Sequence, residues 1–504
     1  MRHLIVTTVT GVAVAFSAVN APAATAAPRP PASTIAWGSC QDPWLAGAGA
    51  ECGTLQVPMD YRGPNGKQIQ IALSRIKHKT PDSAFQGVMM TNPGGPGQPG
   101  LIMSALGPMI PDHAGDAYDW IGFDPRGVGS SKPALSCDPD YMDFNRPNYV
   151  PLTPQLEQTW LNRVQGYANA CGAHNDPDLL ANMKTTDTVA DLERFRVALG
   201  VDKMSFYGYS YGTYVGQVYA TLHPDRVRRM VLDSSVDARN IYYRLNLSED
   251  PGFDRNLNFF LGWVASHDDV YHLGKAPAAV RNVFNEQLVK LARKPAAGAV
   301  GPDEWLDIFQ QASYRQENWT LLGGAFTGWV NRGDGATLKT LFEQIGGRGN
   351  DNGYAAYLAV ECTDTQSPTN WNKWRADTWL AFAKAPYFAW QNAWVNAPCA
   401  FWPAKAGKPV NVGSHSLKSM LLIDETLDAA TPFEGSLEAR NRFPNSALIA
   451  EPGGMNHANT LRGNVCVDGK IAAYLADGTL PARKPGRRAD VECRPLPLPV
   501  PPAS

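Results

Sequence analysis

The chain has almost no excess of charge of either sign, and this restricts its partners. Its 504 residues carry a net charge of −2, so no electrostatic attraction to nucleic acid is expected. No two of its eight cysteines form a C-x-x-C pair, so a zinc site is not expected either. Beyond the first residues, no segment reaches the roughly 18 apolar residues of a membrane span. We expect no metal, no organic cofactor, no nucleic acid and no membrane as partners.

The first 26 residues have the pattern of a secretory signal peptide. Arg2 and His3 form a short basic start, an apolar run follows at 4–19, and Ala24-Thr25-Ala26 is a small-residue cleavage site. Residues 27–37 would be a linker or the start of a propeptide. The mature protein is therefore expected to be secreted, extracellular, free of the membrane and a monomer.

The cysteine count is even, which suits an oxidising compartment. Eight cysteines allow 105 pairings, but these cysteines lie in four sequence-neighbour pairs, which we expect to be bridged. The alternative is that one or two stay free and buried. The expected pairs are Cys40 with Cys52, Cys137 with Cys171, Cys362 with Cys399, and Cys466 with Cys493.

The pentapeptide Gly-Tyr-Ser-Tyr-Gly at 208–212 fits the G-x-S-x-G pattern of a strained turn between a strand and a helix. The stretch at 204–207 is short and aromatic enough for a buried strand, and 213–222 predicts a helix that His223-Pro224 ends. In an α/β-hydrolase, this turn lifts a serine hydroxyl out of the sheet. Ser210 is therefore the candidate nucleophile, and the alternative is an ordinary tight turn.

Strand-like and helical runs alternate along the chain, as a largely parallel sheet requires. The alternation stops at 234–405, which predicts an inserted helical cap between two parts of an α/β-hydrolase core at 38–233 and 406–480. A Pro-rich tail follows at 481–504, and disorder is expected only at the two chain ends. The eight strands predicted for the mostly parallel sheet are 54–58, 68–76, 87–91, 118–123, 204–207, 227–232, 419–423 and 447–450.

Tryptophan is concentrated in the predicted cap, which contains ten of the fourteen in the chain. We expect most of these side chains to pack the cap helices together. Two or three are expected to line a substrate cleft.

A serine hydrolase of this fold has an acid and then a histidine after its nucleophile in the chain. Asp428 follows the strand that ends at 423, and His457 lies in the loop after the last strand. His457 would take the proton of Ser210, and Asp428 would hold the imidazole in the required tautomer.

Two other acids and one other histidine are alternatives for these roles. Asp424 and Glu425 lie near Asp428, but Asp428 has the Thr431-Pro432 that ends such a loop. His415 precedes the seventh strand, so it would lie at the wrong end of the sheet.

The glycine-rich stretch Thr-Asn-Pro-Gly-Gly-Pro-Gly at 91–97 follows the third predicted strand. An α/β-hydrolase takes one oxyanion-hole donor from this loop and the other from the residue after the nucleophile. These donors would be the amides of Gly95 and Tyr211. The alternative, a phosphate-binding loop, lacks the Gly-Lys-Ser/Thr that it requires.

Six motifs together resemble a known family over roughly residues 38–480. The chain is similar to the secreted bacterial tripeptidyl aminopeptidases, relatives of the prolyl aminopeptidases. The resemblance implies release of short peptides, often tripeptides, from free N-termini, with Ser210, Asp428 and His457 as the triad. Relatives usually have glycine where Asp424 stands, and Met455-Asn456 replaces the commoner small residue before the histidine. The motifs are 92–97, 124–130, 207–213, 231–233, Asp428 with Thr431-Pro432, and 454–457.

Such an exopeptidase must bind the free amine of its substrate, which calls for a carboxylate at the far end of the cleft. Glu361 and Asp364 in the cap are the candidates, because Cys362 between them would anchor the segment by its disulfide. The alternative is that both are solvated surface charges.

The sequence thus predicts a secreted serine aminopeptidase, of tripeptidyl or prolyl type, that acts on peptides through an acyl-enzyme on Ser210. A secreted carboxylesterase or lactonase with the same triad is the first alternative. A catalytically inactive hydrolase-fold binding protein is the second, and the intact set of Ser210, Asp428 and His457 argues against it.

Overall fold

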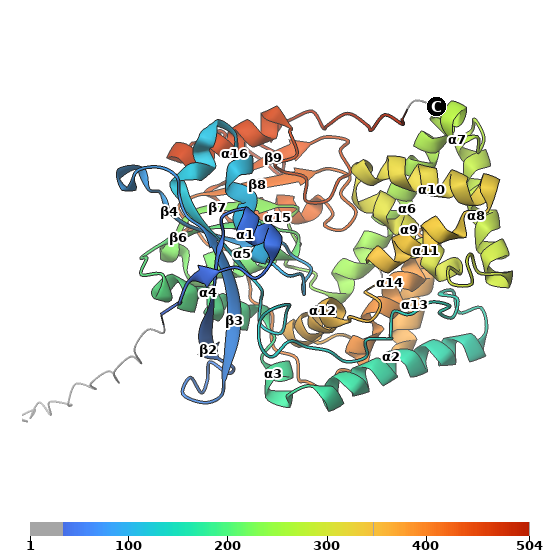
Figure 1. Ribbon diagram of the computed structural model, residues 1–504, viewed down its shortest axis with the longest axis horizontal. Helices are drawn as coiled ribbons and strands as arrows, with labels where there is room; N and C mark the ends of the chain where they lie inside the picture. Colours follow the sequence, from blue (N-terminus) through green and yellow to red (C-terminus); the bar gives the residue numbers. More distant parts are fainter. Residues whose placement is uncertain (1–33, 346, 503–504) are drawn as a thin grey trace, which may run out of the picture.

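The computed structural model describes residues 34–345 and 347–502, in which a twisted sheet lies beside a block of helices (Figure 1). The predicted signal peptide at 1–26 lies outside the described residues, as does most of the linker at 27–37. Within the described ranges, no helix is long and apolar enough to cross a membrane.

The described residues form one sheet of ten strands in the order β1-β2-β3-β5-β4-β6-β7-β8-β9-β10. The eight predicted strands are all present, and two strands of two residues each, β1 (Gly38–Ser39) and β10 (Val491–Glu492), extend its edges. The eight are β2 (Glu51–Pro58), β3 (Gln68–Ile76), β4 (Gly87–Asn92), β5 (Tyr118–Phe123), β6 (Met204–Tyr209), β7 (Val227–Asp233), β8 (Met420–Glu425) and β9 (Ser446–Glu451).

The sheet is parallel from β5 to β10, whereas β1, β2 and β3 join it in antiparallel fashion. Strand β6, which ends just before Ser210, lies between β4 and β7 and is buried along its whole length. Because the carboxyl ends of parallel strands meet at one edge, the loops after β4, β6, β8 and β9 converge there.

Helices cover both faces of the sheet. Neighbouring residues of a strand point to opposite faces, so they pack against different helices. Phe206 packs in the apolar cluster that contains residues of α4 (Thr185–Ala198) and α5 (Tyr211–Leu222). Tyr207 packs in the cluster of α16 (Val465–Asp477). The helix predicted at 213–222, after the nucleophile turn, is thus present as α5. The smaller helices of this part are α1 (Pro43–Gly47), α3 (Pro177–Ala181) and α15 (Glu434–Arg442).

The segment predicted as a cap is helical (Figure 1). Most of its buried apolar side chains form a second cluster, whereas those of α12 (Asn352–Asp364) pack in the cluster of α4 and α5. Four of its tryptophans, Trp305, Trp319, Trp390 and Trp394, are fully buried. Its helices are α6 (Tyr243–Ser266), α7 (Asp268–Tyr271), α8 (Pro277–Arg293), α9 (Pro302–Tyr314), α10 (Trp319–Arg332), α11 (Gly335–Ile345), α12 (Asn352–Asp364), α13 (Trp371–Phe382) and α14 (Ala389–Asn396).

An earlier helix also contributes to this block. Helix α2 (Pro154–His174) belongs to the stretch assigned to the core, yet it runs along the cap helices in Figure 1. Its Trp160 stacks on Trp394 with ring centroids 5.5 Å apart. The helical block is therefore built from two separate stretches of the chain.

The C-terminal segment is part of the fold, although the sequence predicted a disordered end. Strand β10 pairs with β9, and the buried carboxylate of Asp490 binds Arg440 at 2.6 and 2.8 Å. Further on, the indole of Trp263 in α6 donates to the carbonyl of Pro499 at 3.1 Å. These bonds order a stretch whose proline content alone suggested disorder.

The eight cysteines form four disulfides, and none is free among the described residues. The bridges join the pairs expected from their spacing: Cys40–Cys52, Cys137–Cys171, Cys362–Cys399 and Cys466–Cys493.

Candidate active site

Ser210 occupies the turn between β6 and α5 in a backbone conformation that only a tightly held residue adopts. Its φ of 54° and ψ of −127° are costly for a residue with a side chain. A Cβ atom on Gly208 would lie 2.6 Å from the carbonyl oxygen of Gly212, and one on Gly212 would lie 2.6 Å from that of Asn92. Both glycines are therefore required by close backbone contacts.

The structure brings His457 and Asp428 together in a buried pair. Asp428 Oδ2 lies 2.8 Å from His457 Nδ1. Thr431 helps to fix the carboxylate, since its hydroxyl donates to Oδ2 at 2.9 Å and its amide to Oδ1 at 3.2 Å. With Nδ1 donating to Asp428, Nε2 is the nitrogen left to accept a proton. Ser210 and His457 line the same cavity of about 830 Å³.

The other two acids of this loop bind elsewhere. Asp424 accepts a hydrogen bond from the hydroxyl of Ser436 at 2.6 Å, and its burial raises its pKa well above the usual range, with Asp428 adding to the effect. Glu425 accepts from the amide of Asn456 at 2.6 Å, and burial raises its pKa to about 7.

The rival histidine, His415, is exposed and precedes β8. It therefore lies at the opposite end of this strand from Asp428, as expected from the sequence.

The glycine-rich loop after β4 packs directly against the nucleophile turn. A Cβ atom on Gly94 would lie 2.6 Å from the carbonyl oxygen of Tyr209 and 2.8 Å from Ser210 Cβ, and its φ is 100°. Gly95 and Tyr211 both line the cavity with Ser210. The amide of Tyr211 stands at the first position of α5, where a helix offers it no acceptor of its own.

Two carboxyl groups from different cap helices face this cavity. Glu361 of α12 is buried, accepts a hydrogen bond from Asn246 Nδ2 at 3.1 Å, and has its pKa raised to about 8 by burial. Glu249 of α6 lines the same cavity. Burial and the neighbouring Glu361 raise the pKa of Glu249 well above the usual range. The sequence predicts a role for Glu361 but not for Glu249, which no local motif distinguishes from the other acids of the cap.

Asp364, the second predicted amine-binding residue, is not among the residues that line the cavity. Its carboxylate accepts from the amide of Thr185 at 2.6 Å and from the hydroxyl of Tyr242 at 2.9 Å. The hydroxyl of Thr185 in turn lies 2.8 Å from that of Tyr211. Asp364 thus supports the residue that follows the nucleophile, and burial raises its pKa to about 6.

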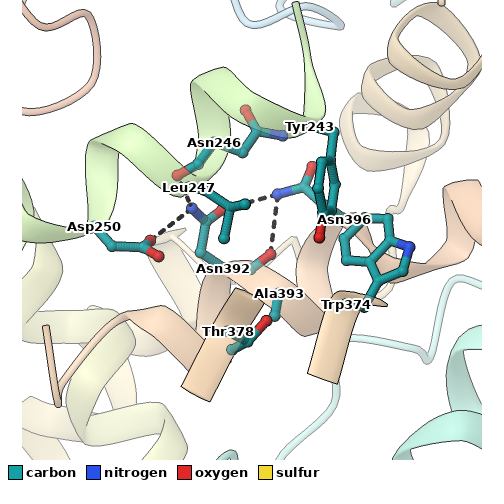
Figure 2. Close-up of a pocket in the computed structure, with 9 residues that line it drawn as sticks. All are labelled: Tyr243, Asn246, Leu247, Asp250, Trp374, Thr378, Asn392, Ala393 and Asn396. Carbon is teal, nitrogen blue, oxygen red and sulfur yellow. Dashed lines mark hydrogen bonds between the residues drawn. The ribbon is translucent and has the colours of Figure 1, made fainter. Parts of the chain in front are cut away.

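A set of side-chain amides stands behind Glu361, around a second cavity of about 10 Å³, the size of one water (Figure 2). Asn392 Nδ2 donates to the carbonyl of Asn246 at 2.7 Å and to Asp250 Oδ1 at 2.8 Å. Asn396 Nδ2 donates to Asn392 Oδ1 at 2.8 Å. These bonds hold the backbone of Asn246, whose side chain binds Glu361.

The prediction that two or three tryptophans line the substrate cleft is wrong. No tryptophan is among the described residues that line the 830 Å³ cavity, and the 10 Å³ cavity has one, Trp374. The large rings are instead used to fill the interior of the helical block. Over the described ranges, no group of three or more His, Cys, Asp or Glu side chains is placed to hold a metal ion.

Comparison with known proteins identifies the family of this chain. Residues 385–493 match the family model described as TAP-like protein, and residues 87–289 match the alpha/beta hydrolase fold. The chain is 38% identical to the tripeptidyl aminopeptidase of Streptomyces lividans, over 95% of this chain and 90% of that protein. It belongs to the tripeptidyl aminopeptidase family.

Other relatives of this chain are named for different activities. The chain is 31% identical to serine protease Hip1 of Mycobacterium tuberculosis, over 86% of each protein. It is 29% identical to carboxylesterase B of the same species, over 88% of each. The choice between peptide and ester substrates therefore depends on what else the cavity binds.

Proposed function

We propose that this protein is a secreted serine exopeptidase that removes short peptides, in particular tripeptides, from free N-termini. The observation that supports this most strongly is a single cavity lined by Ser210, His457 and the two carboxyl groups of Glu249 and Glu361. A hydrolytic centre and an acidic site in one cavity suit a substrate that carries an ammonium group near its scissile bond.

The proposed reaction proceeds through an acyl-enzyme. His457 Nε2 takes the proton of Ser210 as the hydroxyl oxygen attacks the carbonyl carbon of the scissile peptide bond. The amides of Gly95 and Tyr211 bind the resulting oxyanion. His457 then gives the proton to the leaving amine, and a water activated in the same way releases the peptide from Ser210. Asp428 keeps the imidazole oriented and stabilises its charged form.

Glu249 and Glu361 would bind the free N-terminus. Burial raises the pKa values of both carboxyl groups, and the neighbouring Glu361 raises the pKa of Glu249 further. An ammonium group between them would offset this cost of ionisation and form charge-assisted hydrogen bonds. An acetylated N-terminus brings no charge, so it leaves the cost of ionisation in place.

An esterase is the second candidate function, favoured by the relative named carboxylesterase B. The two candidates separate in a comparison of a free peptide, its N-acetylated form and a small uncharged ester. If an aminopeptidase, the protein cleaves the free peptide at least about thirtyfold more efficiently than the acetylated one, from the 2–5 kcal/mol that a lost charge pair costs. Equal cleavage of both peptides, or turnover of the ester alone, would exclude the proposal.

The disulfides support the proposed extracellular location. Such bridges persist in an oxidising environment and are rare in the cytosol. The signal-peptide pattern at 1–26 points to the same compartment.

A further inference from the structure

The loop that carries His457 is bonded to the cap as well as to the sheet. Each of residues 456–458 of this loop is hydrogen-bonded to one of residues 314–316 of the cap. The three bonds run from the His457 amide to the Tyr314 carbonyl (2.8 Å), from the Gln316 amide to Asn456 Oδ1 (2.7 Å) and from the Arg315 guanidinium to the Ala458 carbonyl (3.1 Å).

Asn456 is hydrogen-bonded both to the cap and to the core. On the cap side, its Oδ1 accepts from the amide of Gln316 and its Nδ2 donates to Gln316 Oε1 at 3.2 Å. On the core side, Nδ2 donates to Glu425 Oε1 at 3.1 Å and the Asn456 amide to Oε2 at 2.6 Å. The side chain is buried, so water does not replace these partners. An alanine at this position could make none of the side-chain bonds.

Neighbouring contacts join the cap to His457 and to the loop of Asp428. The ring of Tyr314 packs edge-on against that of His457, with centroids 5.8 Å apart. From α6, Asn256 Nδ2 donates to the carbonyl of Leu427, next to Asp428, at 3.0 Å and to that of Ser313 in the cap at 3.2 Å. The loops of both triad partners are therefore held against the same cap segment.

We propose that Asn456 is a positioning residue that couples the docking of the cap to the placement of His457. The cap then has a role in the chemical step, separate from any role in binding the substrate. Because the coupling acts on the imidazole, it affects every substrate that acylates Ser210, with or without a free amine.

The test compares Asn456→Ala with Asn459→Ala. Asn459 is the matched control, because its Nδ2 donates to the same carboxylate, Glu425 Oε1, at 2.6 Å without a bond to the segment 314–316. For each variant one measures kcat and KM on a small uncharged ester, the rate of fluorophosphonate labelling of Ser210, and the melting temperature.

The expected result is a loss of at least about tenfold in kcat and in labelling rate for Asn456→Ala, with KM within about twofold. Asn459→Ala should keep kcat within about threefold of wild type, even if its melting temperature falls by as much as that of Asn456→Ala. Equal kcat losses in the two variants, or wild-type kcat in Asn456→Ala, would overturn the proposal. The ester and the probe carry no ammonium group, so this outcome does not depend on the aminopeptidase assignment.

A second variant keeps the proposal testable if Asn456→Ala does not fold. Gln316→Ala removes only the acceptor on the cap side and leaves Glu425 fully bonded. It should lower kcat on the ester about threefold or more at unchanged KM, and Gln316→Glu, which keeps the acceptor, should restore most of it. Wild-type kcat in Gln316→Ala would contradict the coupling.

Discussion

Replacing Glu361 by glutamine should weaken the recognition of free N-termini while leaving ester hydrolysis intact. Glutamine has nearly the same shape and keeps an oxygen for Asn246 Nδ2, so the change removes the charge alone. Losing one partner of a desolvated charge pair costs about 2–5 kcal/mol. Because the pKa of Glu361 is about 8, the carboxyl must first ionise at pH 7. This costs about 1.4 kcal/mol of the free energy that the charge pair provides. The remainder corresponds to a fall in kcat/KM of roughly threefold to several-hundredfold.

The same pKa sets the pH dependence of this effect. The charged form of Glu361 increases as pH rises towards 8, so the difference between wild type and Glu361→Gln in kcat/KM on a free peptide should widen between about pH 6 and 8. The ester should show no such widening. The assay is initial-rate kinetics on one free peptide and one uncharged ester across that range.

Asp364→Asn provides a comparison three residues further along α12. Its carboxylate binds Thr185 and Tyr242 and does not line the cavity. This variant should lower the melting temperature and affect peptide and ester activity alike, because a buried acceptor is lost. If Glu361→Gln cleaves the free peptide as well as wild type at pH 8, or loses ester activity to the same extent as peptide activity, then Glu361 does not bind the substrate amine.

Two further predictions concern the acid of the triad and the buried carboxyls. Asp428→Asn should lower kcat by about 10⁴, whereas Asp424→Asn should have little effect because Asp424 binds Ser436 and not His457; a larger loss in Asp424→Asn would refute the assignment. The pKa values of Glu425 and Glu451 are raised to about 7 and about 8 by burial. The unfolded chain releases these protons first, so the free energy of unfolding should fall as pH rises from about 4.5 to 8. Thermal unfolding across that range measures this, and a melting temperature that rises with pH would contradict it.

The features that the sequence predicted well are those fixed by neighbours in the chain. The eight strands and the helix after the nucleophile follow from apolar runs and their flanking turn residues. Asp428 and His457 are predictable because each lies in the loop after a predicted strand, and parallel strands bring such loops together. Their 2.8 Å contact therefore required no knowledge of the cap.

The features that the sequence could not predict depend on how distant segments dock. Glu361 and Asp364 lie three residues apart on a helix whose second half is buried all round, so no polar face indicated which one reaches the cavity. Glu249 comes from a helix about 110 residues earlier in the chain. The C-terminal segment looked like a disordered tail, because its composition gave no sign of the partner that Asp490 finds in Arg440.

The most direct test of the proposed function is the mass of the acyl-enzyme. A free peptide or its C-terminal anilide is mixed with the protein, the reaction is quenched in acid within milliseconds, and the intact mass is measured, with Ser210→Ala as the control. We expect a covalent adduct with the mass of the N-terminal tripeptide acyl group, located on Ser210, and no adduct with the N-acetylated peptide or with Ser210→Ala. An adduct that forms equally from the acetylated peptide, or one that persists in Ser210→Ala, would contradict the proposed function.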